Sequence, residues 1–82
     1  MTMGLTEKEK RERVKFNILI GNHIRKKRLE QNISAAELAR LCFIDKPNLL
    51  RIEKGRVNTS IYILNKIAEA LEISLEELFK GF

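Results

Sequence analysis

The sequence has few of the residues that build chemical sites. Its 82 residues include one cysteine, one histidine, one proline and no tryptophan. A single cysteine excludes an internal disulfide and a cysteine-rich zinc site. There is no Ser/His/Asp set and no glycine-rich phosphate loop, and so small a core has little room for a substrate cavity. We therefore expect a binding module with no metal, cofactor or small-molecule substrate, and not an enzyme.

Long hydrophobic runs are also missing. Uninterrupted apolar stretches reach only four residues, whereas a transmembrane helix needs about 20 and a signal peptide about 7–15. The composition, 44% hydrophobic and 33% charged, is that of an ordinary globular chain. These features predict one domain with no membrane partner and a cytoplasmic location.

Positive charge is concentrated early in the sequence. Residues 1–32 hold nine Lys/Arg against four Asp/Glu, residues 33–58 hold five against three, and residues 59–82 hold two against four. A basic N-terminal part and an acidic C-terminal part are typical of a protein that binds a polyanion with one side. A solvated surface of mixed charge is the alternative that charge alone leaves open.

The spacing of apolar residues is helical throughout, and cap residues divide the chain into five helices. Capping boxes are expected at Thr6–Glu9, Ser34–Glu37 and Ser74–Glu77, because each pairs a Ser or Thr with a Glu three residues later. The predicted fold is all-α and compact. Residues 1–16 form a basic N-terminal arm or an extension of the first helix, and residues 17–82 form the domain.

The most informative window runs from residue 35 to residue 54. Two short helices joined by three or four residues are typical of a helix-turn-helix, in which the helices cross steeply and the second protrudes. That geometry needs apolar residues at a few irregular positions and a small residue where the backbones meet. The window supplies them as Leu38, Ala39, Cys42, Ile44, Leu49 and Ile52.

From Ile20 to Phe79 the chain resembles the Xre family, the Cro and lambda-repressor-like helix-turn-helix domains. The matching positions are Ile20, Gly21, Ile24, Arg25, Arg28, Ser34, residues 37–39, residues 51–55, Asn58 and residues 67–71. The resemblance implies a five-helix, sequence-specific DNA-binding regulator, a repressor or autoregulator, whose third helix enters the major groove. It also implies a homodimer on a palindromic operator.

Three positions depart from the family pattern. Ala35 stands where many members have Gln, and Thr59 stands where Pro is usual. Phe43 occupies a turn position that is often Gly. A left-handed backbone would cost a phenylalanine about 1–2 kcal/mol, so the sequence predicts a differently built turn.

Leu49 and Ile52 face inward on the third helix, which places other residues on its outer side. Candidate base contacts are Lys46, Pro47, Asn48, Leu50 and Arg51; an exposed Leu50 would meet a thymine methyl and Arg51 a guanine. Candidate phosphate contacts are Ser34, Ala35, Arg40, Lys54, Arg56 and Asn58.

Two further sets of residues have structural roles in this hypothesis. Arg28 and Glu53 match a family ion pair that fixes the third helix; the alternative is two exposed charges. Tyr62, Ile63, Phe79 and Phe82 exceed what a small core needs and are the candidate dimer interface. An alternative function for the whole chain is a protein-interaction module that uses the same helical fold.

Overall fold

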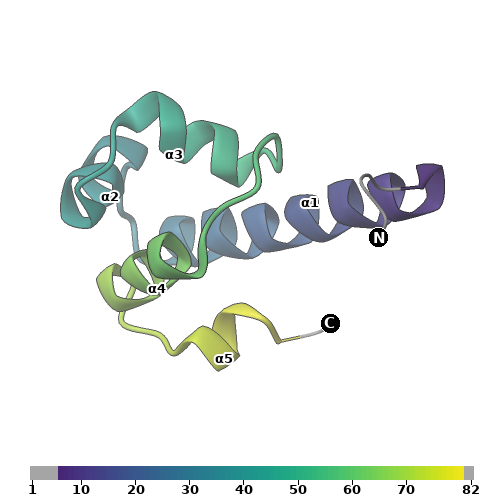
Figure 1. Ribbon diagram of the computed structural model, residues 1–82. Helices are drawn as coiled ribbons and strands as arrows, with labels where there is room; N and C mark the ends of the chain where they lie inside the picture. The colour runs from purple at the N-terminus through teal and green to yellow at the C-terminus, as the bar shows by residue number, and fades with distance from the viewer. Residues whose placement is uncertain (1–5, 81–82) are drawn as a thin grey trace.

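Five helices make up the computed structural model, which describes residues 6–80. They are α1 (Glu7–Glu30), α2 (Ala35–Cys42), α3 (Lys46–Glu53), α4 (Ile61–Ala70) and α5 (Leu75–Leu78). Figure 1 shows α1 as one long rod, with α2 and α3 to one side of it and α5 to the other. The all-α, five-helix prediction is confirmed. None of the helices in residues 6–80 is long and apolar enough to cross a membrane.

One cluster of apolar side chains holds the helices together. Its buried members are Ile20, Ile24, Leu38, Ala39, Cys42, Leu49, Ile52, Leu64, Ile67, Leu71 and Leu78. Helices α1 to α4 each contribute a stripe, because 3.6 residues per turn bring every third or fourth side chain to the same face, and α5 contributes Leu78. Burial raises the pKa of the Cys42 thiol, which keeps it protonated as an apolar filler.

The N-terminal part of α1 is helix from Glu7 onward. Thr6 caps it with a reciprocal box: the Glu9 amide donates to the Thr6 hydroxyl (3.1 Å), and the Thr6 amide donates to the Glu9 carboxylate (2.8 Å). That second bond lowers the pKa of Glu9. Of the two alternatives for residues 1–16, the helical extension describes residues 7–16; residues 1–5 lie outside the described residues.

The capping boxes at Ser34 and Ser74 form only in half. Each serine hydroxyl accepts the amide three residues on, at 3.0 Å, but neither glutamate reaches back. Glu37 instead pairs with Arg40 (2.6 Å), and Glu77 lies 3.7 Å from Lys27. A nearby cation outcompetes a cap amide for the carboxylate, so the full-box prediction is wrong at these two helices.

Four helices end in the same left-handed turn. A residue one or two positions past each end has positive φ: Asn32 (58°), Phe43 (59°), Gly55 (71°) and Glu72 (58°). In each case the following amide bonds to the carbonyl five residues earlier, as Ile44 does to the Ala39 carbonyl at 3.1 Å. This closure turns Ile33, Ile44 and Ile73 against the core. The prediction that Phe43 avoids this conformation is wrong, because the hydrogen bond and the burial of Ile44 compensate for its strain.

Phe43→Gly is expected to stabilise the domain by about 0.5–1 kcal/mol. The Phe43 side chain is 87% exposed, so its removal forfeits little packing. Relief of about 1–2 kcal/mol of left-handed strain exceeds the roughly 0.5–1 kcal/mol that glycine costs in chain entropy. Urea midpoints measure the gain. Asn32→Gly is the matched control and should gain less, since Asn tolerates this conformation; equal gains would contradict the argument.

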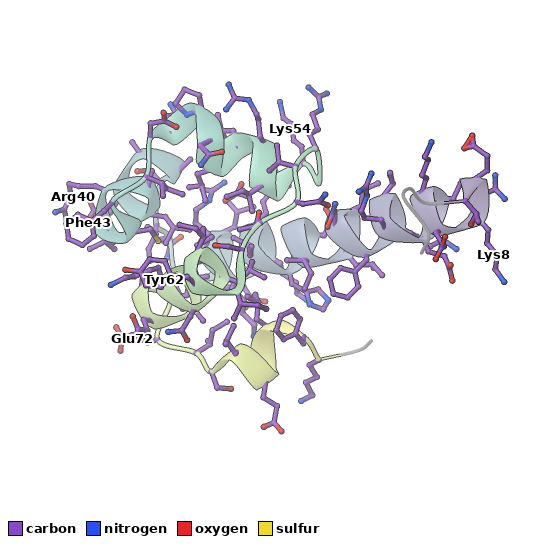
Figure 2. The ribbon with its side chains drawn as sticks, in the orientation of Figure 1. Lys8, Arg40, Phe43, Lys54, Tyr62 and Glu72 are labelled. Carbon is purple, nitrogen blue, oxygen red and sulfur yellow. The ribbon has the colours of Figure 1, made fainter. Side chains whose placement is uncertain are left out.

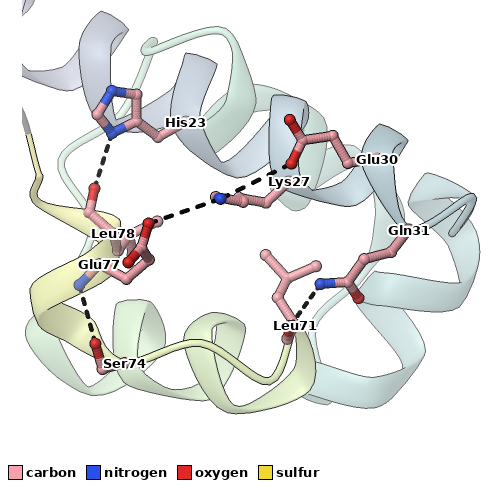
Figure 3. Close-up of polar contacts among 8 residues, drawn as sticks. All are labelled: His23, Lys27, Glu30, Gln31, Leu71, Ser74, Glu77 and Leu78. Atoms are coloured by element: carbon pink, nitrogen blue, oxygen red, sulfur yellow. Dashed lines mark hydrogen bonds and ion pairs between the residues drawn. The ribbon is translucent and has the colours of Figure 1, made fainter.

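Polar contacts fasten the C-terminal part of the chain to α1 (Figure 3). His23 Nδ1 lies 2.9 Å from the Leu78 carbonyl, which can only accept, so the ring donates. The Gln31 side-chain amide donates to the Leu71 carbonyl at 2.6 Å. Lys27 lies between Glu30 (3.8 Å) and Glu77 (3.7 Å). These contacts hold α5, which is only four residues long, at the side of α1.

Candidate nucleic-acid interface

Helix α3 begins at an N-terminal cap that is readable from the sequence. The Asp45 carboxylate accepts the Asn48 amide at 2.9 Å, and Pro47 occupies the first turn, where its missing N–H has no intrahelical partner to lose. Leu49 and Ile52 point into the core. The cap and the two buried side chains together decide which side of α3 faces outward.

The outward side of α3 is basic. Lys46, Pro47 and Arg51 are exposed, while Asn48 and Leu50 are half-buried. The expectation that Leu50 is exposed is therefore wrong, since an eight-residue helix wedged between α1 and α2 leaves only a narrow free strip. Lys54 continues the strip past the helix end (Figure 2).

A buried ion pair joins α1 to α3. The Arg28 guanidinium donates from Nε to Glu53 Oε2 (2.7 Å) and from a terminal nitrogen to Glu53 Oε1 (3.0 Å). Its remaining nitrogen donates to the Ile33 carbonyl at 3.0 Å. Arg28 is 8% exposed and Glu53 3%. This bidentate geometry, rather than the alternative of two exposed charges, fixes the angle of α3.

Two glycines let α1 approach the end of α3 closely. A Cβ on Gly21 would lie 2.4 Å from the Glu53 carbonyl oxygen. A Cβ on Gly55, whose φ is +71°, would lie 2.6 Å from the Ile18 Cα. Only glycine fits both sites, so the backbones of α1 and the α3 terminus are in direct contact.

The candidate phosphate contacts lie around α3, and they differ in exposure and in the hydrogen bonds that they already make. Lys54 and Arg56 are exposed beside its C-terminal end. Ser34 uses its hydroxyl as the α2 cap, and Ala35 packs partly against the core. Arg40 and Asn58 are exposed but already bonded: Arg40 to Glu37 at 2.6 Å, and Asn58 to Asn17 at 2.7 Å.

The candidate dimer residues do not form one exposed patch. Ile63 and Phe79 pack against the core, and the Phe79 ring stacks on Phe16 with centroids 6.4 Å apart. Tyr62 is 66% exposed, with Lys66 over its ring at 5.5 Å. Phe82 lies outside the described residues. Ile61, which the sequence analysis did not single out, is 63% exposed beside Tyr62.

The structure gives Asn17, Gly21 and Ile61 positions that sequence reasoning did not predict. Asn17 braces the α3–α4 loop through Asn58, Gly21 sets the distance between α1 and α3, and Ile61 is an exposed apolar side chain. A glycine inside a helical pattern was a readable signal, because it usually has a packing reason. No signal in the sequence marks Asn17 as the partner of Asn58.

Comparison with known proteins identifies the family. The helix-turn-helix family model matches residues 24–78. The chain belongs to the helix-turn-helix family. No curated protein sequence matched it.

Solved structures of this helix-turn-helix chain's relatives agree with the assignment. The restriction-modification controller protein C.AhdI from Aeromonas hydrophila is 32% identical, with a TM-score of 0.74 over 76% of this chain and 94% of that one. An HTH_3 family transcriptional regulator from Vibrio cholerae is 33% identical, with a TM-score of 0.77 over 82% of this chain and 38% of that one. The clp gene regulator ClgR from Corynebacterium glutamicum, at 23% identity and TM-score 0.77 over 78% and 82%, shares the fold.

The family and these neighbours place the helix-turn-helix chain among DNA-binding transcriptional regulators. The Vibrio cholerae regulator is much longer, since this chain spans 38% of its length. The lambda-repressor-like fold is confirmed.

Proposed function

We propose that this helix-turn-helix protein binds a palindromic DNA operator in a sequence-specific manner, as a homodimer, and acts as a repressor or autoregulator by occupying that operator. The observation that carries the proposal is the exposed basic strip of α3, held at a fixed angle by the buried Arg28–Glu53 pair. Resemblance to a restriction-modification controller supports a regulatory role. A helix presented in this way has the dimensions to enter a major groove.

Base reading falls to the α3 side chains with free polar groups. Arg51 is exposed in the middle of the strip and can donate two parallel bonds to guanine O6 and N7. Lys46 and Pro47 lie at the leading end, and the half-buried Asn48 and Leu50 can offer only their outer atoms. Lys54 and Arg56 suit phosphates, and Ser34 and Ala35 place the positive end of the α2 dipole nearby.

Selection of bound sequences from random duplex DNA tests the proposal. The expected outcome is a symmetric consensus whose affinity falls steeply as salt rises, because each neutralised phosphate releases counterions. Enrichment of no sequence, with weak and uniform retention of all duplexes, would overturn sequence-specific regulation. It would favour the alternative of a protein-interaction module.

Arg51→Ala is expected to weaken binding to the selected duplex by about 1–3 kcal/mol and to relax the preference at one base pair in each half-site. Titrations against the selected duplex and against duplexes changed at single positions measure both effects. Lys54→Ala is the matched control and should weaken all duplexes about equally. If Arg51→Ala also weakens all duplexes equally, Arg51 contacts phosphate and does not read a base.

Dimerisation rests on the exposed start of α4 in our proposal. One recognition helix reads only a few base pairs, and a two-fold pair places two helices in successive grooves about 34 Å apart. Ile61 and Tyr62 are the adjacent large apolar residues that α4 leaves exposed. Ile63 and Phe79, which the sequence also suggested, pack against the core. In this proposal they hold the exposed residues in place and do not contact the second subunit.

Tyr62→Asp combined with Ile61→Asp is expected to convert a micromolar dimer to monomer without unfolding it. Sedimentation equilibrium measures the assembly, and circular dichroism checks the fold. Val14→Asp, at another exposed apolar residue, is the control and should leave the dimer intact. A wild-type chain that stays monomeric at all concentrations, even on a palindromic duplex, would refute the dimer.

A further inference from the structure

The N-terminal part of α1 extends beyond the body of the domain. Residues 7–15 are all exposed, and the first residues of α1 with tertiary contacts are Phe16, stacked on Phe79, and Asn17, bonded to Asn58. We call residues 7–15 the projecting segment. Nine residues at about 1.5 Å each make it about 13 Å long, and Figure 1 shows it extending past the α3–α4 loop. It also lies outside the family match at residues 24–78.

Helical periodicity decides which side of the projecting segment faces the α3 terminus. Residues seven apart share a face, since two turns take about 7.2 residues. Lys10 lies two turns before Asn17, which bonds to Asn58 in the α3–α4 loop. Arg11 lies two turns before Ile18, whose backbone abuts Gly55. Lys10 and Arg11 therefore lie on the loop-facing side.

The opposite side of the segment is acidic. Glu9 and Glu12 lie seven and four residues before Phe16, on the side that faces Phe79 and α5. Glu7 is the one acid toward the loop. Arg13, four residues before Asn17, lies at the edge of that side, and Lys8 and Lys15, eleven and four residues before Leu19, lie on the side of Leu19. Three of the five cations of the projecting segment, Lys10, Arg11 and Arg13, thus lie on or beside the side where Lys54 and Arg56 are exposed, and two of its three acids lie on the opposite side.

Pairing with a second α1 is the less favoured use of the segment. A helix pair needs one apolar stripe. The exposed apolar residues of this half of α1 point in different directions: Val14 and Ile18 toward the loop, Phe16 toward α5, and Leu19 away from both. The ordered feature is charge, and the partner that matches it is a polyanion.

We propose that the projecting segment contacts backbone phosphates of the operator duplex outside the stretch that α3 reads. Lys10 and Arg11 continue the line of exposed cations that starts at Lys54 and Arg56. A reach of about 13 Å corresponds to about four base pairs at 3.4 Å per step. The segment therefore lengthens the footprint and adds affinity without adding base readout. This inference rests on the proposed DNA-binding function.

The test compares two double variants of equal charge. Lys10→Ala/Arg11→Ala removes two loop-facing cations, and Lys8→Ala/Lys80→Ala removes two exposed cations elsewhere. Both lower the net charge from +5 to +3. Each is titrated against the selected site in a 40-base-pair duplex and against the same site trimmed to its last preferred base. Thermal unfolding checks that both variants fold.

On the long duplex, Lys10→Ala/Arg11→Ala should reduce the slope of log affinity against log salt by about 1.8, that is about 0.9 for each lost phosphate contact. Raising salt from 50 to 200 mM should then weaken the wild type about tenfold more than this variant. The control variant should match the wild type, and on the trimmed duplex all three should agree. Ethylation interference with the wild type should mark phosphates beyond the preferred bases.

Equal slopes for the two variants on the long duplex would overturn the inference. So would a loss that persists unchanged on the trimmed duplex, because the contact would then lie within the read stretch. A wild type that shows no sequence preference in the initial selection would instead refute the proposed function. The two failures are therefore distinguishable.

Discussion

Arg28→Met is expected to cost about 3–5 kcal/mol, a large share of the stability of the protein at 25 °C. The substitution leaves the Glu53 carboxylate, 3% exposed, without the bidentate partner that compensates for its burial. It also removes the donor to the Ile33 carbonyl. A domain of this size has about 4–12 kcal/mol of stability in total. Urea midpoints, or folded fractions if no baseline survives, measure the loss.

Two further variants isolate the cause of that loss. Arg25→Met removes an exposed arginine three residues away on the same helix and should change stability by less than about 0.5 kcal/mol. Arg28→Met/Glu53→Leu removes both charges and should recover much of the stability, since apolar replacement of a buried pair is often neutral. Indistinguishable midpoints for Arg28→Met and Arg25→Met would mean that the pair contributes nothing.

The core and the helix order could be predicted from the sequence because they depend on periodic spacing. Leu38, Leu49 and Ile52 are buried as their spacing indicates, and each helix begins at its expected Ser, Thr or Asp cap. Such signals are local, so residues close in sequence suffice to read them. Family resemblance supplied the one long-range contact, between Arg28 and Glu53.

What the sequence missed depends on competition between groups far apart in the chain. Glu77 fits a capping box on local evidence, but Lys27 lies 50 positions earlier and draws the carboxylate away. Phe43 is unfavourable in a left-handed turn by itself, yet the burial of Ile44 outweighs that cost. No local sequence pattern shows which of these competing interactions is the stronger.

The candidate nucleic-acid interface also has features that local spacing predicts and features that long-range packing decides. Arg51 and Lys54 are exposed as the helix period requires, but Leu50 is half-buried by neighbours on other helices. Ile61 and Ile63 are the same type of residue. Only the packing of α4 decides that Ile61 is exposed and that Ile63 contacts the core. Side-chain type therefore predicts what a residue can do, and tertiary packing decides which residues are free to do it.

Gly21→Ala is expected to destabilise the domain by about 3 kcal/mol, although alanine is the better helix former. In an isolated helix the change would gain about 1 kcal/mol. Here the added methyl carbon would lie 2.4 Å from the Glu53 carbonyl oxygen and 2.5 Å from that of Ile52. Both are backbone atoms that cannot rotate away, so α1 and α3 must separate, at a cost near the upper end of overpacking.

Separating the two helices would also stretch the Arg28–Glu53 bonds, because that pair spans the same junction. DNA affinity should therefore fall in Gly21→Ala even under conditions where most molecules remain folded, since α3 no longer has a fixed angle. Urea midpoints for Gly21→Ala and for the adjacent, exposed Asn22→Ala provide the comparison. Asn22→Ala should be neutral or slightly stabilising. If Gly21→Ala also gained stability, α1 and α3 would not be in backbone contact, and the placement of α3 would need another explanation.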